Sequence, residues 1–134
     1  MNTIYWDSCI FIYSLEASEE TRLKISQKLA TLPQSVLCHT ALTELECRVE
    51  PLRNGKSELL ARYERLFAAS HTRRLALTDE IYRFATELRA LHRLKTPDAL
   101  HLAAALSHGC DSFWTQDDRL GRAAEGRIQL VIPV

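Results

Sequence analysis

The segment TIYWDSCIFIY, residues 3–13, carries one charge, Asp7, within an otherwise nearly apolar run. Its first four residues are mostly β-branched or aromatic and predict a strand that ends just before Asp7. A carboxylate costs several kcal/mol to remove from water without a partner. An acid in this position therefore either faces solvent or has a positively charged partner.

Further short apolar segments predict strands of the same kind. With the first, they cover residues 3–6, 35–39, 74–77, 110–114 and 128–132. Between them lie longer segments with helical periodicity, and one of these places Ile81, Phe84, Ala85 and Leu88 on a single helix face. Strands that alternate with helices indicate a parallel sheet covered on both faces. The predicted class is α/β, with four to five strands in a single domain over residues 1–134.

Composition narrows the class of protein. The chain has 17 basic and 17 acidic residues, which argues against a generic polyanion binder but leaves room for a local basic rim. Its 46% hydrophobic and 25% charged residues are typical of an ordered globular domain. No apolar run approaches the roughly 20 residues that span a bilayer, so we expect no membrane association and a cytoplasmic location.

The cysteines lie far apart in the sequence and form no Cys-x-x-Cys pair. They are Cys9, Cys38, Cys47 and Cys110. Zinc sites and disulfide frameworks have closer or more regular spacings. We therefore expect reduced, buried thiols.

Three acids occupy positions where parallel sheets build their binding sites. Ligands of such sheets bind beyond the carboxyl ends of the strands. Asp7 follows the first predicted strand, and Asp117 follows the fourth after two intervening residues. Asp98 lies in the first turn of a helix that Thr96 is expected to cap, where a carboxylate also gains from the helix dipole. Stabilisation of that helix alone is the alternative explanation for Asp98.

The helix predicted after the second strand contains two glutamates, which geometry separates. At about 100° per residue, Leu42, Leu45 and Val49 form one apolar face. Glu46 falls roughly 40° from Leu42 on this face, whereas Glu44 points in roughly the opposite direction. We therefore expect Glu44 to be solvated and Glu46 to face the sheet or the rim of the crevice.

If Asp7, Glu46, Asp98 and Asp117 converge, their repulsion raises their pKa values unless a cation is present. Oxygen-only donor sets suit Mg²⁺ or Mn²⁺, whereas zinc prefers nitrogen and sulfur. A divalent ion beside a phosphate lowers the pKa of a bound water and stabilises an in-line displacement. The acids therefore predict metal-dependent phosphodiester hydrolysis.

Four short motifs occur in a fixed order along the chain. They are Asp-Ser after a strand at residues 7–8, Thr-x-x-Glu at 43–46, Pro-Asp-Ala-Leu-His-Leu-Ala-Ala-Ala at 97–105 and Thr-x-Asp-x-x-Leu at 115–120. This order resembles that of PIN-domain nucleases over nearly the whole chain. A short chain of this kind is most similar to the VapC-type toxins of type II toxin-antitoxin systems.

The resemblance implies a PIN-like α/β/α sandwich with the activity of a Mg²⁺- or Mn²⁺-dependent endoribonuclease acting on RNA. It also implies frequent homodimerisation and neutralisation by a cognate antitoxin. On this resemblance, Asp7 and Asp98 are the principal metal ligands, and Asp117 is a further ligand, direct or through water. Glu46 ligates the metal or orients the attacking water.

Ser8 and Thr115 match family positions where a hydroxyl orients the metal-binding carboxylates. Asp118 is an alternative to Asp117, because neighbouring loop residues can exchange roles. The family often has a small residue such as glycine soon after the catalytic glutamate, whereas an arginine, a valine and a glutamate follow here. This departure leaves the substrate preference open.

Other residues near the predicted crevice have two interpretations each. Four basic residues are candidate contacts to RNA phosphates: Arg48, Arg93, Lys95 and Arg119. For any one of them a solvated surface residue is the favoured interpretation, whereas for the set we expect at least a few to contact RNA. We expect His101 to be a hydrogen-bonding core histidine, because no second histidine completes a metal site. Trp6 and Trp114 could stack on bases, but tryptophans in strands are usually core residues.

Three other functions stay open at the level of sequence. A metal-dependent phosphatase of the phospho-aspartate type would use Asp7 as its nucleophile, but it needs a second acid two residues later, where Cys9 stands. A phosphate-sensing receiver module needs paired acids near the first strand and a lysine after a late strand, and neither is present. A catalytically silent PIN fold that serves as a binding module is disfavoured by the presence of all four acids.

Overall fold

A parallel sheet forms the centre of the protein, which a computed structural model describes over residues 1–134. The five strands lie in the order β3-β2-β1-β4-β5. Their bounds are Asn2–Trp6 (β1), Ser35–His39 (β2), Thr72–Arg74 (β3), Ser112–Trp114 (β4) and Gln129–Val131 (β5). Every neighbouring pair is parallel, so the carboxyl ends of all five strands lie along one edge.

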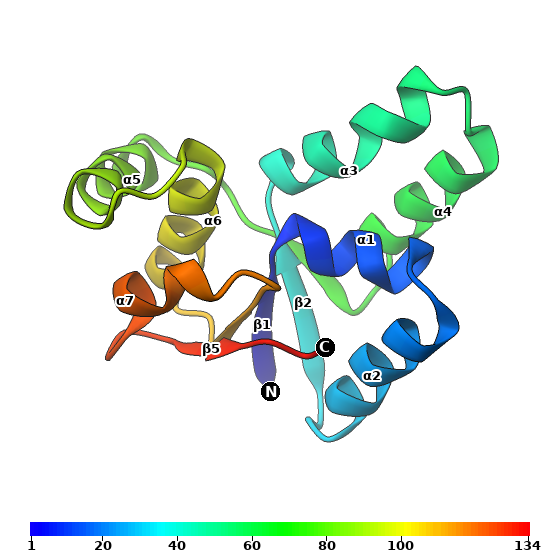
Figure 1. Cartoon of the computed structure of the whole chain (residues 1–134), viewed down its shortest axis with the longest axis horizontal. Coiled ribbons are helices and arrows are strands. Elements are labelled where there is room, and N and C mark those ends of the chain that lie inside the picture. Colours follow the sequence, from blue (N-terminus) through cyan, green and yellow to red (C-terminus); the bar gives the residue numbers. More distant parts are fainter.

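Helices cover both faces of this sheet (Figure 1). On one face lie α1 (Ser8–Glu16), α2 (Glu19–Ala30), α3 (Ala41–Arg53) and α4 (Ser57–Phe67). On the other lie α5 (Asp79–His92), α6 (Thr96–Ser107) and the short α7 (Gly121–Ala124), which follows the 3₁₀ turn η1 (Asp118–Leu120). The predicted α/β/α sandwich is therefore confirmed.

The central strand divides its side chains between two hydrophobic cores. Ile4 and Trp6 pack against the α1 to α4 layer, and Tyr5 packs against the α5 to α7 layer. Each is at most 3% exposed. This alternation follows from the two-residue period of a strand that is buried on both faces. Trp6 and Trp114 stack with ring centroids 6.0 Å apart, which confirms both tryptophans as core residues.

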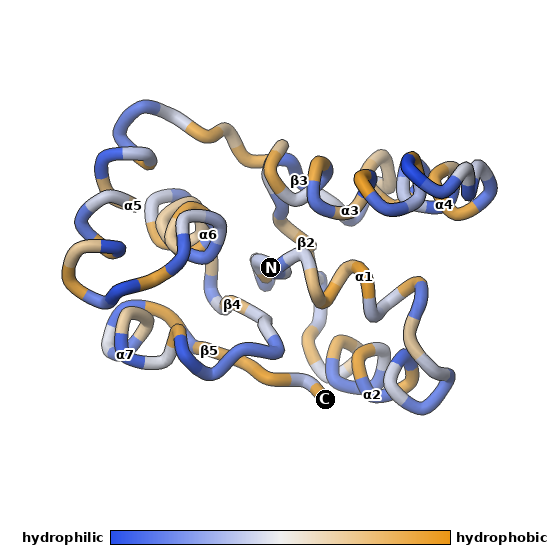
Figure 2. Tube along the Cα trace, turned by 45° about the horizontal axis from the view of Figure 1, so that its top comes forward, coloured by the Kyte–Doolittle hydropathy of each residue, from blue (hydrophilic) through white to orange (hydrophobic).

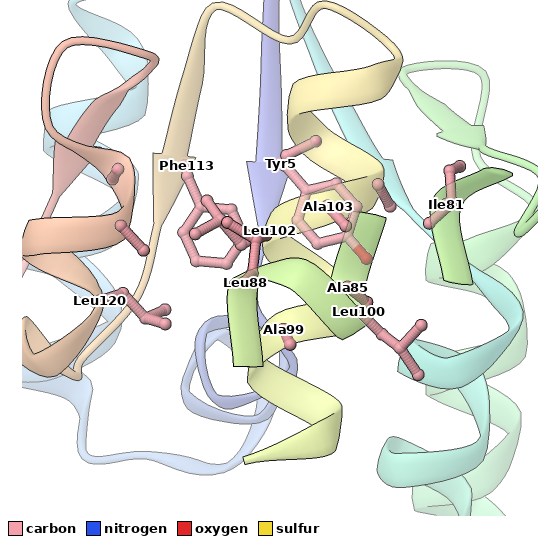
Figure 3. Packing of buried hydrophobic residues seen from close by; sticks show 14 of the residues in the cluster. Tyr5, Ile81, Ala85, Leu88, Ala99, Leu100, Leu102, Ala103, Phe113 and Leu120 are labelled. Carbon is pink, nitrogen blue, oxygen red and sulfur yellow. The ribbon is translucent and has the colours of Figure 1, made fainter. Parts of the chain in front are cut away.

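The α-helix that carries the Ala-rich motif is the most buried helix of the fold. Ala99 to Ala105 are all buried, and Figure 2 shows α6 as a largely hydrophobic segment. Its alanines let the helix lie close to the sheet, where Tyr5 and Phe113 stack at 5.4 Å and Leu88 of α5 closes the cluster (Figure 3). The motif therefore fixes the start of α6 relative to the carboxyl ends of β1 and β4.

Local signals position most helix starts as the sequence predicts. The side chains of Ser18 and Thr78 accept hydrogen bonds from the first turns of α2 and α5. The expected cap of α6 shifts by one residue, because Lys95 occupies the cap position and Thr96 is the first helical residue. Such a shift changes the face of no later residue in the helix.

The third predicted strand, residues 74–77, is wrong in its position. The observed strand β3 is Thr72–Arg74, at the edge of the sheet and largely exposed. Leu75 is buried, but it packs under α5 where the chain leaves the sheet. The apolar residues that suggested a strand therefore belong to the connection that follows it.

All four cysteines are free, as expected, although only Cys38 and Cys47 are buried and the other two are partly exposed. Burial raises the pKa of the Cys47 thiol to about 12 and that of Cys9 to about 11. Both therefore stay protonated near neutral pH. No helix has the length and apolar character needed to cross a membrane.

Candidate metal centre

A cleft of about 570 Å³ opens at the carboxyl ends of the central strands. Its walls come from the starts of α1 and α6, from α3, and from the loop between β4 and η1. It is lined by Asp7, Ser8, Cys9, Ile12, Glu46, Lys95, Asp98, Gln116, Asp117 and Arg119. The structure thus brings the four predicted acids into one cleft.

Asp7 is held by hydrogen bonds on both carboxylate oxygens. It caps α1, where Oδ1 accepts the backbone N–H of Ser8 at 2.8 Å. The hydroxyl of Thr115 donates to Oδ2 at 2.9 Å. The same hydroxyl oxygen accepts the backbone N–H of Asp117 at 3.1 Å, so Thr115 ties two acids of the cleft together. These contacts fix the Asp7 carboxylate at the end of β1.

Glu46 is held through only one of its oxygens. Oε1 lies 2.7 Å from the Ser8 hydroxyl, which donates to it, and 2.6 Å from Nε2 of His101. Burial opposes ionisation of Glu46, but these hydrogen bonds outweigh it and keep the pKa of the carboxyl below its ordinary value. The glutamate is therefore a carboxylate with Oε2 directed to no protein donor.

Asp98 differs from its neighbours because its carboxylate has no hydrogen bond or ion pair within the protein. It lies half-buried in the first turn of α6. Burial raises its pKa, and the nearby charges of Asp7 and Asp117 raise it further. A partly buried anion that faces two like charges is the feature expected of a cation ligand without its cation.

Asp117 is the acid best compensated by the protein. The Arg119 guanidinium contacts its Oδ2 at 2.6 Å, and this bond holds the pKa of Asp117 below its usual range. Asp117 lines the cleft, whereas its neighbour Asp118 is exposed and does not. The geometry therefore favours Asp117 over the alternative acid.

The donor set fits a hard divalent cation. Four carboxylates from four parts of the chain line the cleft, and the one histidine beside them uses both ring nitrogens in hydrogen bonds. Oxygen donors of this kind suit Mg²⁺ or Mn²⁺ better than zinc. No three Asp, Glu, His or Cys side chains are already arranged closely enough to enclose an ion. Binding would thus draw the carboxylates closer together.

The predicted basic residues fall into two groups. Lys95 and Arg119 line the cleft, and Arg93 lines the cavities beside it. Arg48 does not reach the cleft: its guanidinium contacts Glu64 at 2.6 Å and Glu44 at 3.2 Å. Arg48 therefore connects α3 to α4.

The expectation that Glu44 is solvated is wrong. Glu44 is 9% exposed and accepts hydrogen bonds from His39, Arg48 and Arg74. Burial opposes its ionisation, but these partners keep the pKa of its carboxyl below the ordinary value. It joins β2, β3 and α3 beside the sheet edge.

The face of α3 that was predicted to pack against the sheet is also wrong. Leu45 is 57% exposed and Val49 is 40% exposed, while Thr43 and Cys47 are buried against the fold. Glu46 adjoins this buried side and so reaches the cleft rim. Its position in the cleft is as expected, although the apolar stripe that suggested it is exposed.

A chain of buried, hydrogen-bonded polar side chains lies behind the cleft, and the sequence predicted only one of its members, His101. His101 is a hydrogen-bonding core residue, as expected, with 1% exposure. Its Nδ1 lies 2.7 Å from the hydroxyl of Tyr5, and that hydroxyl lies 3.3 Å from the Thr40 hydroxyl. Sequence reasoning missed Tyr5. A signal was present in the sequence: Tyr5 lies between Ile4 and Trp6, which face the other core, in the strand that ends directly before Asp7.

Comparison with known proteins gives a family and a set of similar folds. A family model described as PIN domain matches residues 4–126. Among curated proteins, no sequence matches the chain. The solved structures discussed next have sequence identities that establish similarity of fold only.

One similar structure is VapBC2 from Rickettsia felis bound to a DNA fragment from its promoter, with a TM-score of 0.75, 12% identity and coverage of 96% of this chain and 97% of that chain. Another is a toxin-antitoxin complex from Klebsiella pneumoniae, with a TM-score of 0.71, 23% identity and 98% coverage of both chains. A third is Mycobacterium tuberculosis VapC20, described as a sarcin-ricin loop cleaving toxin, with a TM-score of 0.75, 15% identity and coverage of 94% of this chain and 98% of that chain.

Proposed function

The chain belongs to the PIN domain family, and on this premise we propose that it is a divalent-metal-dependent endoribonuclease and the toxin of a toxin-antitoxin pair. The observation that carries the proposal is the cleft in which Asp7, Glu46, Asp98 and Asp117 meet at the carboxyl edge of the sheet. Nucleases of this family generally use divalent metal ions. The substrate bond is an RNA phosphodiester.

Asp7 and Asp98 hold the metal directly in this proposal. Two hydrogen bonds orient the Asp7 carboxylate. The Asp98 carboxylate has no hydrogen bond or ion pair that a metal ion would have to displace. Asp117 contributes through water, because its carboxylate already binds Arg119. When bound, Mg²⁺ or Mn²⁺ supplies Lewis-acid chemistry: it lowers the pKa of a water and stabilises charge on the phosphate.

Glu46 orients the attacking water and accepts its proton. One oxygen is anchored by Ser8 and His101, which leaves Oε2 free to face the cleft. Its depressed pKa keeps it ionised and ready to accept a hydrogen bond. Ser8 and Thr115 act as positioning residues, because each hydroxyl donates to a carboxylate of the cleft.

Basic residues on one side of the cleft hold the RNA. Lys95 and Arg119 line the cleft beside the acids, and both carry charges that suit phosphate oxygens. Without such cations, four carboxylates would repel a polyanion. Arg93 contributes from the adjacent cavity, whereas the ion pairs of Arg48 assign it no part in RNA binding.

The proposed partners follow from the structural neighbours. Those from Rickettsia felis and Klebsiella pneumoniae are described as VapBC2 and as a toxin-antitoxin complex. We therefore expect a cognate antitoxin that binds this chain and suppresses cleavage, and a homodimer as the active form. Sequencing next to the gene shows whether a small reading frame lies there, and co-expression of its product with this chain, followed by co-purification, tests the first expectation.

The central test is RNA cleavage by the purified chain with Mg²⁺ or Mn²⁺. Asp7→Asn and Asp98→Asn should each abolish cleavage, because each removes a direct metal ligand. Glu87→Gln changes an exposed acid on α5 that does not line the cleft, and this variant should cleave as the unchanged chain does. Comparison of Asp117→Asn with Asp118→Asn assigns the fourth acid.

Two outcomes of that test would overturn the proposal. If the unchanged chain cleaves no RNA with either ion but still binds an antitoxin, it is a catalytically silent PIN module. If it hydrolyses a small phosphate ester and leaves RNA intact, it is a phosphatase. Expression of the Asp98→Asn variant in cells provides the matching toxicity control.

A further inference from the structure

Three neighbouring cavities share lining residues, and the metal-binding cleft is the first of them. The cleft shares Lys95, Asp98 and Arg119 with a second cavity of about 200 Å³. The second shares His92, Arg93 and Arg119 with a third of about 220 Å³. These shared residues make the cavities neighbours, so that basic side chains follow one another from the acids to the end of α5 and the start of α7. The basic groove is defined here by His92, Arg93, Lys95, Arg119 and Arg122.

Charge changes sign along this path. The cleft holds four carboxylates, and the second cavity has Asp98 as its only acid beside three cations. The third cavity has no acid at all and is lined by three arginines together with His92 and Leu91. A phosphate is therefore repelled at the metal-free cleft and attracted along the basic groove.

The cations of the groove are largely free to bind a ligand. Arg93, Lys95 and Arg122 are exposed and form no ion pair within 4.0 Å. Only Arg119 is paired, with Asp117. Charges on the protein surface usually find local partners or stay dispersed, so unpaired arginines around one cavity favour an external anion.

The opposite side of the cleft offers no such path. The α1 and α3 wall contributes the uncharged residues Ser8, Cys9 and Ile12 and the acid Glu46. The nearest basic residue of α3 discussed above, Arg48, is bound by Glu44 and Glu64. A polyanion that enters the cleft therefore has a favourable route on one side only.

The backbone at the groove supports the same conclusion. Arg93 ends α5 in the left-handed region, with φ of 55°. Glycine adopts this conformation at lower cost and is the commonest residue at such a helix end. An arginine adopts this conformation at a higher backbone cost than a glycine would. From this position Arg93 lines both of the smaller cavities.

We propose that the basic groove binds the phosphate backbone of the substrate strand on one side of the scissile bond. The inference rests on the proposed function and adds the side of the cleft along which the strand runs. Arginine forks match phosphate oxygens, and no Phe, Tyr or Trp lines the groove to stack on bases. The groove therefore contributes affinity that is independent of sequence.

The test measures binding of a fluorescein-labelled single-stranded RNA in EDTA, so that cleavage does not intervene. Arg93→Gln and Arg122→Gln should each weaken binding about tenfold at low salt, as expected for loss of one charge-assisted phosphate contact. Each should also reduce the slope of log K against log salt by about 0.7, and the double variant should lose about twice that. Arg83→Gln is the matched control, since Arg83 is an exposed arginine of α5 that lines none of the cavities.

A single-stranded DNA of the same sequence separates backbone contact from other recognition. Equal losses with DNA and RNA support a contact to phosphates, and losses confined to RNA overturn it, because they indicate recognition of the 2′-hydroxyl. If both groove variants bind like the Arg83 variant while the chain still cleaves RNA with Mn²⁺, the groove is wrong and the proposed function stands. If the unchanged chain neither binds nor cleaves RNA, both fail.

Discussion

Asp98 occupies a position that lowers the stability of the metal-free chain. Burial and the charges of Asp7 and Asp117 raise its pKa above the ordinary value of 3.8. The folded state therefore holds the Asp98 proton more tightly than the unfolded state does. The free energy of unfolding accordingly falls as pH rises from 3.8 through the raised pKa, and the loss is complete at neutral pH.

Replacement of this acid should separate stability from activity. Asp98→Asn removes the repelled charge, so the metal-free variant should melt at a higher temperature than the unchanged chain at pH 7. Scanning calorimetry in EDTA measures it. Below the ordinary pKa of aspartate the two proteins should melt alike. A lower melting temperature for the variant at pH 7 would contradict the assigned repulsion.

His101 should affect catalysis without touching the substrate. It anchors one oxygen of Glu46 and is itself oriented by the Tyr5 hydroxyl. His101→Leu should slow cleavage about 10- to 100-fold, as loss of an orienting partner commonly does. His101→Gln retains an amide donor and should restore part of the rate. Equal rates for Leu and Gln variants that are both fully folded would argue against the positioning role.

At the level of single elements, α3 shows where periodicity misleads. Periodicity treats every apolar residue as a core residue, but Leu45 and Val49 face away from the sheet. The buried side of the helix is instead polar and small, with Glu44 held by partners on β2 and β3. A buried acid with three donors depends on residues distant in sequence, so no local pattern reveals it.

The observed orientation of α3 predicts effects of different size for two adjacent residues. Glu44→Gln removes the charge that binds Arg48, Arg74 and His39, and it should cost about 1–3 kcal/mol of unfolding free energy, as for hydrogen bonds to a charged group. Leu45→Gln alters an exposed side chain and should stay within about 0.5 kcal/mol of the unchanged chain. Urea unfolding of both variants decides between the two orientations of α3. The orientation predicted from the sequence requires the larger loss of unfolding free energy for Leu45→Gln.

The strands that lead directly into the cleft were predictable, whereas the edge strand β3 was not. β1 and β4 consist largely of buried apolar residues, and β1 ends directly before Asp7, whereas β4 ends three residues before Asp117. The apolar segment and the acidic motif therefore predict the same strand end. β3 has only Thr72, Arg73 and Arg74, and its exposed edge position gives no apolar signal. Leu75, which follows β3, is buried and apolar, and for that reason the predicted strand was placed in the connection to α5.

For the molecule as a whole, the order of the motifs predicted the positions of the acids but not the side chains that hydrogen-bond to them. Asp7, Asp98 and Asp117 follow from the rule that parallel sheets bind ligands at their carboxyl edge. Their hydrogen-bond partners Thr115 and His101 come from other parts of the chain, and only the fold shows which acid each one holds. Charge balance likewise hides the basic groove, because 17 basic residues are offset by 17 acidic ones over the chain as a whole.

The cleft also joins the two helical layers of the molecule. Asp7 and Glu46 belong to the layer of α1 to α4, whereas Asp98 and Asp117 belong to the segments of α6 and η1 on the other side. In the absence of a cation these acids repel one another across the layers. A divalent ion bound by Asp7 from one layer and Asp98 from the other should therefore stabilise the fold as a whole.

This stabilisation can be measured without any nuclease assay. At a free Mn²⁺ concentration of about 100 times its Kd, the unfolding free energy should rise by about 2.7 kcal/mol, which shifts the melting temperature by about 10 °C for a chain of this size. Excess EDTA should reverse the shift, and KCl at equal ionic strength should not reproduce it. Asp98→Asn should lose most of the response, since it removes a ligand that links the layers, while Glu87→Gln should retain it. An equal shift in the Asp98 variant and the unchanged chain would place the bound ion outside the cleft.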